Sequence, residues 1–406
     1  MGEWINCTLA DIGNIVGGAT PSTKHDDYYG GDIPWITPKD LSSFSGRYIS
    51  RGERNITDAG LSSCSAQMLP RNSILFSSRA PIGYVAITAQ KMCTNQGFKS
   101  VVPNENVDYL FLYYLLLFNK DKIEAMGSGT TFKEVSGKTM KLVPVNIPAD
   151  IGEQKKIASI LGTIDDKIEN NSRMNDNLKQ QVSEIYKAWY QDYICAGDVP
   201  LVESEYGMIP EGWHYSLLGE LCRSVSVTHK FDAEKLIFLN TGDVEDGRFL
   251  HSNYKAVSDM PGQAKKTIAP GDILYSEIRP INKHFAYVNF PATNYVVSTK
   301  LMVIRANSFD SRRLYHFLTS RDVLSELQMQ AESRSGTFPQ IRFDNVSKLP
   351  ILIANEATEA AFTTLLHTVY EQIEHNNREN EKLSTLRDSL LPRLMSGEID
   401  VSAIQL

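Results

Sequence analysis

The sequence predicts an α+β protein in which two pseudo-symmetric α/β domains are separated by two long helices that form an antiparallel coiled coil. Two observations support this prediction. Segments of the first half recur in the same order in the second half, which indicates an internal duplication. Each half also ends in a long stretch whose apolar residues recur at steps of three and four, as the seam of a coiled coil does.

Four pairs of similar segments define the duplication, and their offsets lie between 199 and 209 residues. The pairs are WINCTLADI (4–12) with WHYSLLGEL (213–221), SILFSSRAP (73–81) with DILYSEIRP (272–280), TFKEVSGKTMKLVPVNI (131–147) with TFPQIRFDNVSKLPILI (337–353), and IDDKIENNSRMNDNL (164–178) with VYEQIEHNNRENEKL (369–383). Trp4 and Trp213 occupy equivalent positions, which favours packing in a core over stacking on a base.

Each half is therefore expected to be a globular domain followed by a helix. The globular parts mix short β-rich runs with Gly, Pro and Ser punctuation, and each carries a helix near its end. Gly197 can close the first long helix, and Pro200 prevents its resumption. The predicted boundaries are 1–149 and 197–354 for the globular domains, and 150–196 and 355–406 for the helices.

The first long helix has a clear start. Asp150 and Glu153 have the spacing of a capping box, and the helix should run to about Tyr193. Each seam carries two Asn near its middle. If the helices pair antiparallel, these Asn meet and select one register at a cost in stability; alternatively they lie just off the seam and are solvated. The predicted seam comprises Ile157, Leu161, Ile164, Ile168, Asn171, Asn175, Leu178 and Val182, with Phe362, Leu366, Val369, Ile373, Asn376, Asn380, Leu383 and Leu390.

A Ser-Gly-Lys-Thr tetrapeptide at residues 136–139 resembles the end of a phosphate-binding loop, but its surroundings argue against one. Such a loop requires a glycine where this chain has Phe132, so that consecutive N–H groups can wrap the phosphates. No regular helix is expected at Met140, because Pro144 and Pro148 follow closely.

The composition argues against a membrane, secreted or zinc-binding protein. No apolar run approaches the roughly 18 residues of a membrane helix, and the N-terminus does not resemble a signal peptide. Five scattered cysteines without a Cys-x-x-Cys pair suggest the reducing cytoplasm and no structural zinc. The formal net charge is −7, but the acid excess lies in residues 151–200 and 356–406. The two globular parts are neutral overall, so net charge does not exclude DNA binding.

Taken together, several motifs resemble the specificity subunit of type I restriction–modification systems, and the resemblance covers nearly the whole chain. GTTFKEVSGKTMKLVPVNIPADIGEQKKIASILGTIDDKI (129–168) and LSTLRDSLLPRLMSGEIDV (383–401) resemble the central and C-terminal conserved regions of that family. IPEGW (209–213) is similar to the start of its second target-recognition domain, and IPWITPKDL (33–41) to an early motif of the first.

The second helix departs from the family pattern at its start. The first helix has Glu-Gln at residues 153–154 followed by Ile157, whereas the second has Glu-Ala at residues 359–360 followed by Thr363. We therefore expect the N-terminal end of the second helix to hold a partner less typically.

The resemblance implies a non-catalytic subunit with two target-recognition domains, each reading one half of a bipartite site in double-stranded DNA. It further implies two modification subunits that bind S-adenosylmethionine and methylate adenine N6, and two restriction subunits that use ATP and Mg²⁺ for translocation and cleavage. The sequence itself contains no adenine-methylation motif, no Gly-rich cofactor loop after a strand and no P-loop. No cofactor is therefore expected on this chain, and the acidic faces of the coiled coil are candidate docking surfaces.

Candidate DNA contacts are polar residues in loops that could reach phosphates or base edges. Arg79 and Arg279 are favoured, because both lie beside a proline after matching strands, and Glu277 could accept from a cytosine amino group. The candidates in the first half are Ser22, Thr23, Lys24, Thr37, Lys39, Ser78, Arg79, Asn95, Gln96 and Lys133. Those in the second half are Thr228, His229, Lys230, Asn240, Thr241, Lys265, Lys266, Glu277, Arg279, Lys283, Lys300 and Arg334.

Two other function classes remain as alternatives. A pseudo-dimeric enzyme would need catalytic groups at equivalent places in both halves, and the repeat brings none into register. A pseudo-dimeric interaction scaffold that binds no nucleic acid would share the coiled coil but lack salt-dependent DNA binding. None of the eight His residues forms a recognisable metal site.

Overall fold

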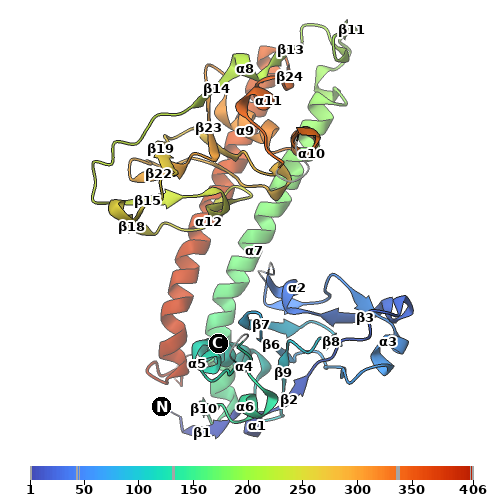
Figure 1. Ribbon diagram of the computed structural model, residues 1–406, viewed down its shortest axis with the longest axis vertical. Coiled ribbons are helices and arrows are strands. Elements are labelled where there is room, and N and C mark those ends of the chain that lie inside the picture. The colour runs from blue at the N-terminus through green and yellow to red at the C-terminus, as the bar shows by residue number, and fades with distance from the viewer. Residues whose placement is uncertain are drawn as a thin grey trace. The chain divides into compact units, whose positions relative to one another are not determined.

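The chain folds into two compact units, each made of one globular head and one half of each long helix (Figure 1). Unit 1 comprises Met1–Met174 and Asn376–Leu406, and unit 2 comprises Asn175–His375. The computed structural model describes residues 2–42, 44, 46–129, 133–334, 339–402 and 404, apart from the side chain of Arg334. Two members of the repeat, residues 131–132 and 337–338, lie outside this range.

The head of unit 1 is built of short strands and short helices, and it ends at the first long helix. Its elements are β1 (Trp4–Thr8), α1 (Leu9–Ile12), β2 (Gly13–Gly17), η1 (Asp26–Tyr28), β3 (Tyr29–Ile36), α2 (Pro38–Ser42), β4 (Tyr48–Ile49), β5 (Asn55–Ile56), α3 (Asp58–Ser62), β6 (Ile74–Ser78), β7 (Ile82–Thr88), β8 (Cys93–Thr94), β9 (Lys99–Pro103), α4 (Tyr109–Phe118), α5 (Lys120–Ala125), α6 (Gly137–Lys141), β10 (Pro144–Pro148) and the long helix α7 (Ile151–Tyr190).

Unit 2 contains, after the end of α7, a short hairpin, a globular head and the start of the second long helix. Its elements are η2 (Ile194–Ala196), β11 (Leu201–Ser204), β12 (Gly207–Pro210), β13 (His214–Leu217), α8 (Leu218–Leu221), β14 (Cys222–Val225), β15 (Lys235–Leu239), η3 (Thr241–Asp243), β16 (Val244–Glu245), β17 (Arg248–Phe249), β18 (Tyr254–Ala256), η4 (Val257–Asp259), β19 (Ala264–Lys266), β20 (Ile273–Ser276), η5 (Pro280–Asn282), β21 (Phe285–Tyr287), β22 (Tyr295–Ser298), β23 (Leu301–Ala306), α9 (Ser311–Leu318), α10 (Arg321–Arg334), α11 (Phe343–Ser347), β24 (Pro350–Ile353) and the long helix α12 (Glu356–Met395).

The sheets of the two heads share one topology, so the predicted α+β class and duplication are confirmed. The order β2-β9-β6-β7 in unit 1 recurs as β14-β23-β20-β21 in unit 2. The first strand of each head pairs antiparallel with its last, β1 with β10 and β13 with β24. A parallel pair also recurs, β3 with β8 and β15 with β22. Each head packs its helix pair, α4–α5 or α9–α10, against its own apolar core.

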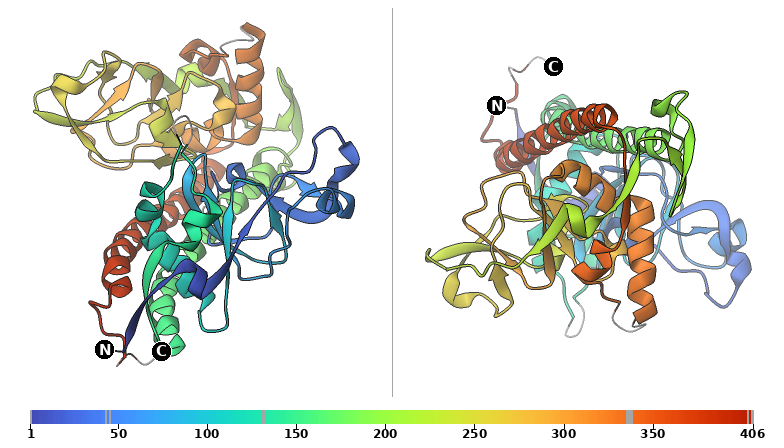
Figure 2. Two further views of the ribbon diagram at one scale, coloured as in Figure 1. Left: turned by 60° about the horizontal axis from the view of Figure 1, so that its bottom comes forward. Right: turned by 90° about the horizontal axis from the view of Figure 1, so that it is seen from above.

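The long helices begin at equivalent caps and pair antiparallel within each unit (Figures 1 and 2). Asp150 accepts from the N–H groups of Gly152 and Glu153 at 3.1 Å, and Asn355 accepts from that of Thr358 at 2.9 Å. These bonds satisfy N–H groups that have no partner inside the helix. Helix α7 ends at Tyr190, three residues before the predicted end.

The sixteen residues of the predicted seam are all buried or half-buried. In unit 1 the Nδ2 of Asn171, a side chain only 1% exposed, donates to Asn380 Oδ1 at 2.9 Å and to Glu379 Oε2 at 2.7 Å. Arg387 donates to Asp165 at 2.9 Å in the same stretch. In unit 2 the rings of Trp189 and Tyr190 pack on Phe362.

Each head is fastened to its own helix by buried arginines. In unit 1, Arg47 lies between α2 and β4 and reaches α7, where its guanidinium pairs with Glu169 at 2.9 Å and with Asp166. In unit 2, Arg312 on α9 pairs with Glu374 of α12 at 2.7 Å. Glu169 and Glu374 are equivalent positions of the repeat, but their arginine partners come from different elements. The two heads have therefore reached the same attachment by different residues.

A second arginine of α9 is completely buried beside the helices of unit 2. The guanidinium of Arg313 lies over the rings of Tyr190 and Tyr186, 4.4 and 5.1 Å from their centroids. Its Nη2 donates to the carbonyl of Leu352 at 3.2 Å, and its Nε lies 3.5 Å from the carboxylate of Glu359. Cation–π contacts thus accompany the ion pair in this desolvated position.

One sequence-based expectation about the helices was wrong. A short helix, α6, does include Met140, because Ser136 caps it by accepting from Thr139 N at 3.0 Å and it ends before Pro144. Near the start of α7, Gln154 is 1% exposed and donates to Pro148 O at 3.0 Å. Glu359 in the second helix is likewise held by its own head, through Arg313 and a bond from Ala354 N at 2.9 Å.

We predict that Arg47→Met destabilises unit 1 by about 2 kcal/mol. The substitution leaves the carboxylates of Asp166 and Glu169 on α7 without their cationic partner, and Glu169 is largely buried. Lys39→Met is the matched control, because it breaks an ion pair with Glu53 whose members are 79% and 66% exposed. Its expected cost is below about 0.5 kcal/mol. Urea unfolding of both variants measures the difference, and equal midpoints would contradict the anchoring role.

Candidate nucleic-acid interface

Four of the ten predicted DNA contacts of unit 1, Thr37, Ser78, Asn95 and Gln96, lie where the parallel strands β3 and β8 end. Thr37 follows β3 and Asn95 follows β8, and Asn95 N donates to Ile36 O at 2.9 Å. Gln96 accepts a hydrogen bond from Thr20, and Ser78 N at the end of β6 donates to Gly97 O at 2.7 Å. The ends of three strands and the loop after β2 therefore form one polar edge.

The same edge recurs in unit 2, at the ends of β15 and β22. Asn240 follows β15, and Lys300 lies just after β22. Lys266 Nζ donates to the carbonyls of Thr299 and Leu301 at 3.0 and 2.8 Å, and the backbone of Thr228 bridges to Lys266. Six predicted residues of this half lie at or beside this edge: Thr228, His229, Asn240, Lys266, Glu277 and Lys300.

A lysine–carboxylate pair lies at the polar edge of each head, but the carboxylate comes from different elements. In unit 1, Lys99 at the start of β9 lies 3.3 Å from Glu134, in the segment that leads to α6. In unit 2, Lys300 lies 3.6 Å from Glu277, just after β20. Its backbone position corresponds to Gly97 rather than to Lys99, because Ser78 N donates to Gly97 O and the equivalent Glu277 N donates to Lys300 O.

In each head, the position that carries the carboxylate in the other head is occupied by a neutral residue. Lys99 Nζ lies 3.4 Å from Ser78 Oγ, and Lys300 Nζ lies 3.5 Å from Gln340 Oε1. Ser78 and Glu277 are equivalent, as are Glu134 and Gln340. The sequence analysis did not predict Lys99 and Glu134, because the two residues lie 35 positions apart in the chain and no local pattern connects them.

A second cation lies close to the carboxylate in each head. Arg79 lies 3.7 Å from Glu134 in unit 1. In unit 2, burial lowers the pKa of Lys266, while the charge of Glu277 raises that pKa and the charge of Lys300 lowers it. Each edge therefore holds two cations around one carboxylate, which leaves it with an excess of positive charge.

Exposure separates the predicted contacts into groups. Ser78 was a wrong choice, because it is fully buried and its hydroxyl donates to Gly97 O at 3.1 Å. The side chain of Arg334 lies outside the described residues. Half-buried candidates are Thr37, Arg79, Asn95, His229, Asn240, Thr241, Lys266, Glu277 and Lys300. Exposed candidates are Ser22, Thr23, Lys24, Lys39, Gln96, Lys133, Thr228, Lys230, Lys265, Arg279 and Lys283.

Several half-buried candidates already serve the local backbone. Thr37 donates its hydroxyl to Asp40 at 2.6 Å, and Asn95 Oδ1 accepts from Gly97 N at 2.8 Å. Asn240 Oδ1 accepts from Thr241 N at 2.9 Å, and His229 Nδ1 accepts from Phe231 N at 2.8 Å. These side chains shape the loops that present the exposed candidates.

Arg79 and Arg279 were both favoured as DNA contacts, but they do not occupy equivalent positions of the repeat. Arg279 directly precedes Pro280 and has φ +44°, and the residue with that place and backbone in unit 1 is Ala80, at φ +52°. Arg279 is exposed, whereas Arg79 is half-buried beside Glu134. The two arginines therefore face different surroundings.

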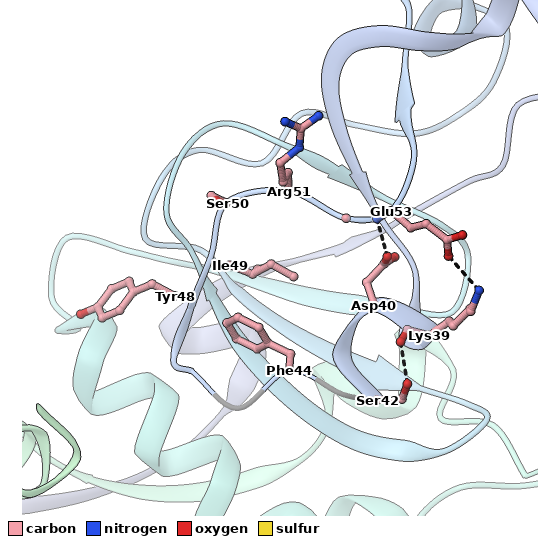
Figure 3. Close-up of a pocket in the computed structure, with 10 residues that line it drawn as sticks. Lys39, Asp40, Ser42, Phe44, Tyr48, Ile49, Ser50, Arg51 and Glu53 are labelled. Atoms are coloured by element: carbon pink, nitrogen blue, oxygen red, sulfur yellow. Dashed lines mark hydrogen bonds and ion pairs between the residues drawn. The ribbon is translucent and has the colours of Figure 1, made fainter. Parts of the chain in front are cut away.

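A surface hollow in unit 1 is lined by Lys39, Asp40 and the loop of residues 48–53 (Figure 3). Asp40 accepts from Thr37 N and from Glu53 N, both at 2.7 Å, so its carboxylate holds the loop together. Lys39 pairs with Glu53. In the part of the chain that the structure describes, no group of three or more His, Cys, Asp or Glu could hold a metal ion. None of the helices described there has the length and apolarity of a membrane span.

We predict that the two arrangements of the lysine–carboxylate pair are interchangeable. Glu277→Ser leaves Lys300 and Lys266 without their shared carboxylate and should destabilise unit 2 by roughly 0.5–1 kcal/mol, since the pair is partly exposed. Adding Gln340→Glu restores a carboxylate at the position that Glu134 occupies in unit 1, and should recover most of this loss. Urea unfolding tests this, with Gln340→Glu alone as control; a double variant no more stable than Glu277→Ser would contradict it.

Comparisons with known proteins agree with this architecture. The family described as the type I restriction modification DNA specificity domain matches residues 1–180 and 210–385. The MjaIX specificity subunit of Methanocaldococcus jannaschii, a type I restriction enzyme subunit, is 32% identical over 99% of this chain and 95% of its own length.

Two further comparisons cover part of the sequence or the fold alone. The HindI specificity subunit of Haemophilus influenzae is 42% identical over 181 residues, which are 44% of this chain and 39% of that protein. The crystal structure of a type I restriction–modification S subunit from M. genitalium shares the fold, with a TM-score of 0.60 at 14% identity over 97% of this chain and 96% of that one. The chain therefore belongs to the family of type I restriction–modification specificity subunits, the non-catalytic members of these systems.

Proposed function

We propose that each head reads one half of an asymmetric, two-part DNA site. The observation that supports this most strongly is the shared edge at the ends of β3–β8 and β15–β22, which has one framework but different side chains in the two heads. Unit 1 carries Thr37 and Asn95 there, and unit 2 carries Asn240 and Lys300. Because side chains at such an edge differ, the two half-sites should differ as well.

The exposed candidates divide by chemistry. Lysines and arginines can neutralise phosphates, and these contacts position the protein without reading sequence. Gln96 and Thr228 are exposed groups that can donate to or accept from base edges. We propose that Lys24, Lys230 and Lys265 chiefly contact phosphates, and that the neighbouring polar side chains supply the sequence selectivity.

The coiled coil would set the spacing of the half-sites and dock two modification subunits along its outer faces. The acid excess of residues 151–200 and 356–406 supports this, because it lies on the segments that form the helices. Base flipping and methyl transfer from S-adenosylmethionine would then occur on the modification subunits. ATP and Mg²⁺ would be bound by two restriction subunits.

Long-read methylation mapping tests this proposal directly. DNA from cells that co-express the chain with its modification subunit should carry one new, asymmetric, two-part motif with methyl-adenine in both halves. An unsplit or palindromic motif would mean that only one head reads DNA. Absence of new methylation, with the modification subunit shown to be folded and bound, would favour an interaction scaffold instead.

The spacing role has its own test. Inserting one heptad at equivalent positions of α7 and α12 lengthens both helices by about 10 Å at 1.5 Å per residue. The unread gap of the methylated motif should widen by roughly three base pairs, given a rise of about 3.4 Å per pair along one strand. A heptad variant that methylates with the original gap would rule out this role.

A further inference from the structure

An acidic hairpin segment, residues 191–211, follows α7 and contains β11 and β12. The two strands pair antiparallel from Leu201↔Pro210 to Ser204↔Gly207, and Glu211 N donates to Pro200 O at 2.8 Å. Figures 1 and 2 show it within unit 2 at the end of α7, on the side away from β15 and β18. The segment therefore lies apart from the polar edge that we assign to DNA.

The residues just after α7 pack like those just after α12. After α12, the equivalent tail packs into the core of unit 1, where Val401 is fully buried and Gly397, at φ +75°, lies against Trp4. After α7, Tyr193 packs in the same way against Trp213. The hairpin follows this tail, and Ile209, 3% exposed, anchors it to unit 2.

Large apolar side chains of the acidic hairpin segment are exposed to an unusual degree. Such clustering on one short segment marks an interaction surface more often than scattered apolar residues do. The exposed side chains and their exposed fractions are Ile194 (70%), Val199 (39%), Leu201 (50%), Val202 (38%), Tyr206 (46%) and Met208 (51%).

The charge of the segment indicates what kind of partner it fits. It contains no Lys, Arg or His, and it carries five exposed acids, Asp192, Asp198, Glu203, Glu205 and Glu211. Five carboxylates repel the phosphates of nucleic acid. They attract a protein surface that carries Lys and Arg, since complementary charge favours encounter and selects partners.

The backbone offers a place for such a segment to bind. Strands β11 and β12 form a two-stranded sheet within the described chain, so each has one edge without a neighbouring strand. On β12 the carbonyl of Met208 accepts from the hydroxyl of Tyr193 at 3.1 Å, which occupies part of that edge. The edge of β11 is therefore the better position for an added strand.

We propose that the acidic hairpin segment docks a basic segment with apolar side chains, contributed by another protein subunit of the type I complex and lying along β11. This surface is separate from the coiled-coil faces and from the DNA-reading edges.

Charge reversal tests the electrostatic part of the proposal. Glu203→Lys/Glu205→Lys should weaken association of the full chain with the docked subunit on the order of tenfold, measured without DNA, because two attractive charges become repulsive. Asp232→Lys/Glu234→Lys is the matched control, since both residues are exposed in unit 2, lie two positions apart and change the net charge equally. The control should bind the subunit like the wild type.

Cross-linking identifies the occupant. A photo-reactive residue at Leu201, in the complex reconstituted with the modification and restriction subunits, should cross-link to a Lys- or Arg-containing segment of one of them. Cross-linking to a second copy of this chain would overturn the proposal. So would no cross-link together with unchanged association of the charge-reversal variant. The methylated motif of each variant reports separately on DNA reading.

Discussion

The side-chain amide of Asn171 donates to Asn380 inside the seam of the two long helices, and the register that this contact selects determines what else can form in unit 1. A buried Asn pair costs stability relative to an apolar pair but disfavours shifted registers. Arg387 meets Asp165 in this register. The same stretch of α7 carries Glu169, which holds the head through Arg47. Register of the helices and attachment of the head are thus set by neighbouring residues.

In unit 2, different side chains attach the head to its long helix. Arg312 meets Glu374, the counterpart of Glu169, but it comes from α9 rather than from a loop. Beside it, Arg313 is enclosed by aromatic rings and a carboxylate. At the polar edges, too, each head has a lysine–carboxylate pair, but the carboxylate comes from a different element in each head. Duplication has kept the geometry of the framework in both heads, while the residues that provide each contact have diverged, which leaves the loops free to differ.

Sequence alone predicted the features that depend on local periodicity. Patterns within short stretches of sequence indicate the seam residues, from Ile157 to Leu390, the cap at Asp150 and the internal repeat. These features can therefore be predicted without a structure. Contacts between distant segments were not predictable in this way. The partner of Arg47 lies 122 residues away, and the burial of Gln154 and Ser78 follows from tertiary packing that their polar character conceals. The hairpin of β11 and β12 was not predicted from the sequence, because its strands have only four residues each.

The central claim, that the two heads read separate half-sites, is tested most directly by altering one head at a time and mapping the methylated motif. Thr228, Lys230 and Lys265 replaced by Ala should relax or weaken recognition in one half of the motif only. Ser22, Thr23 and Lys24 replaced by Ala should do the same to the other half. A variant that changes both halves of the motif together, or two variants that change the same half, would contradict independent reading by the two heads.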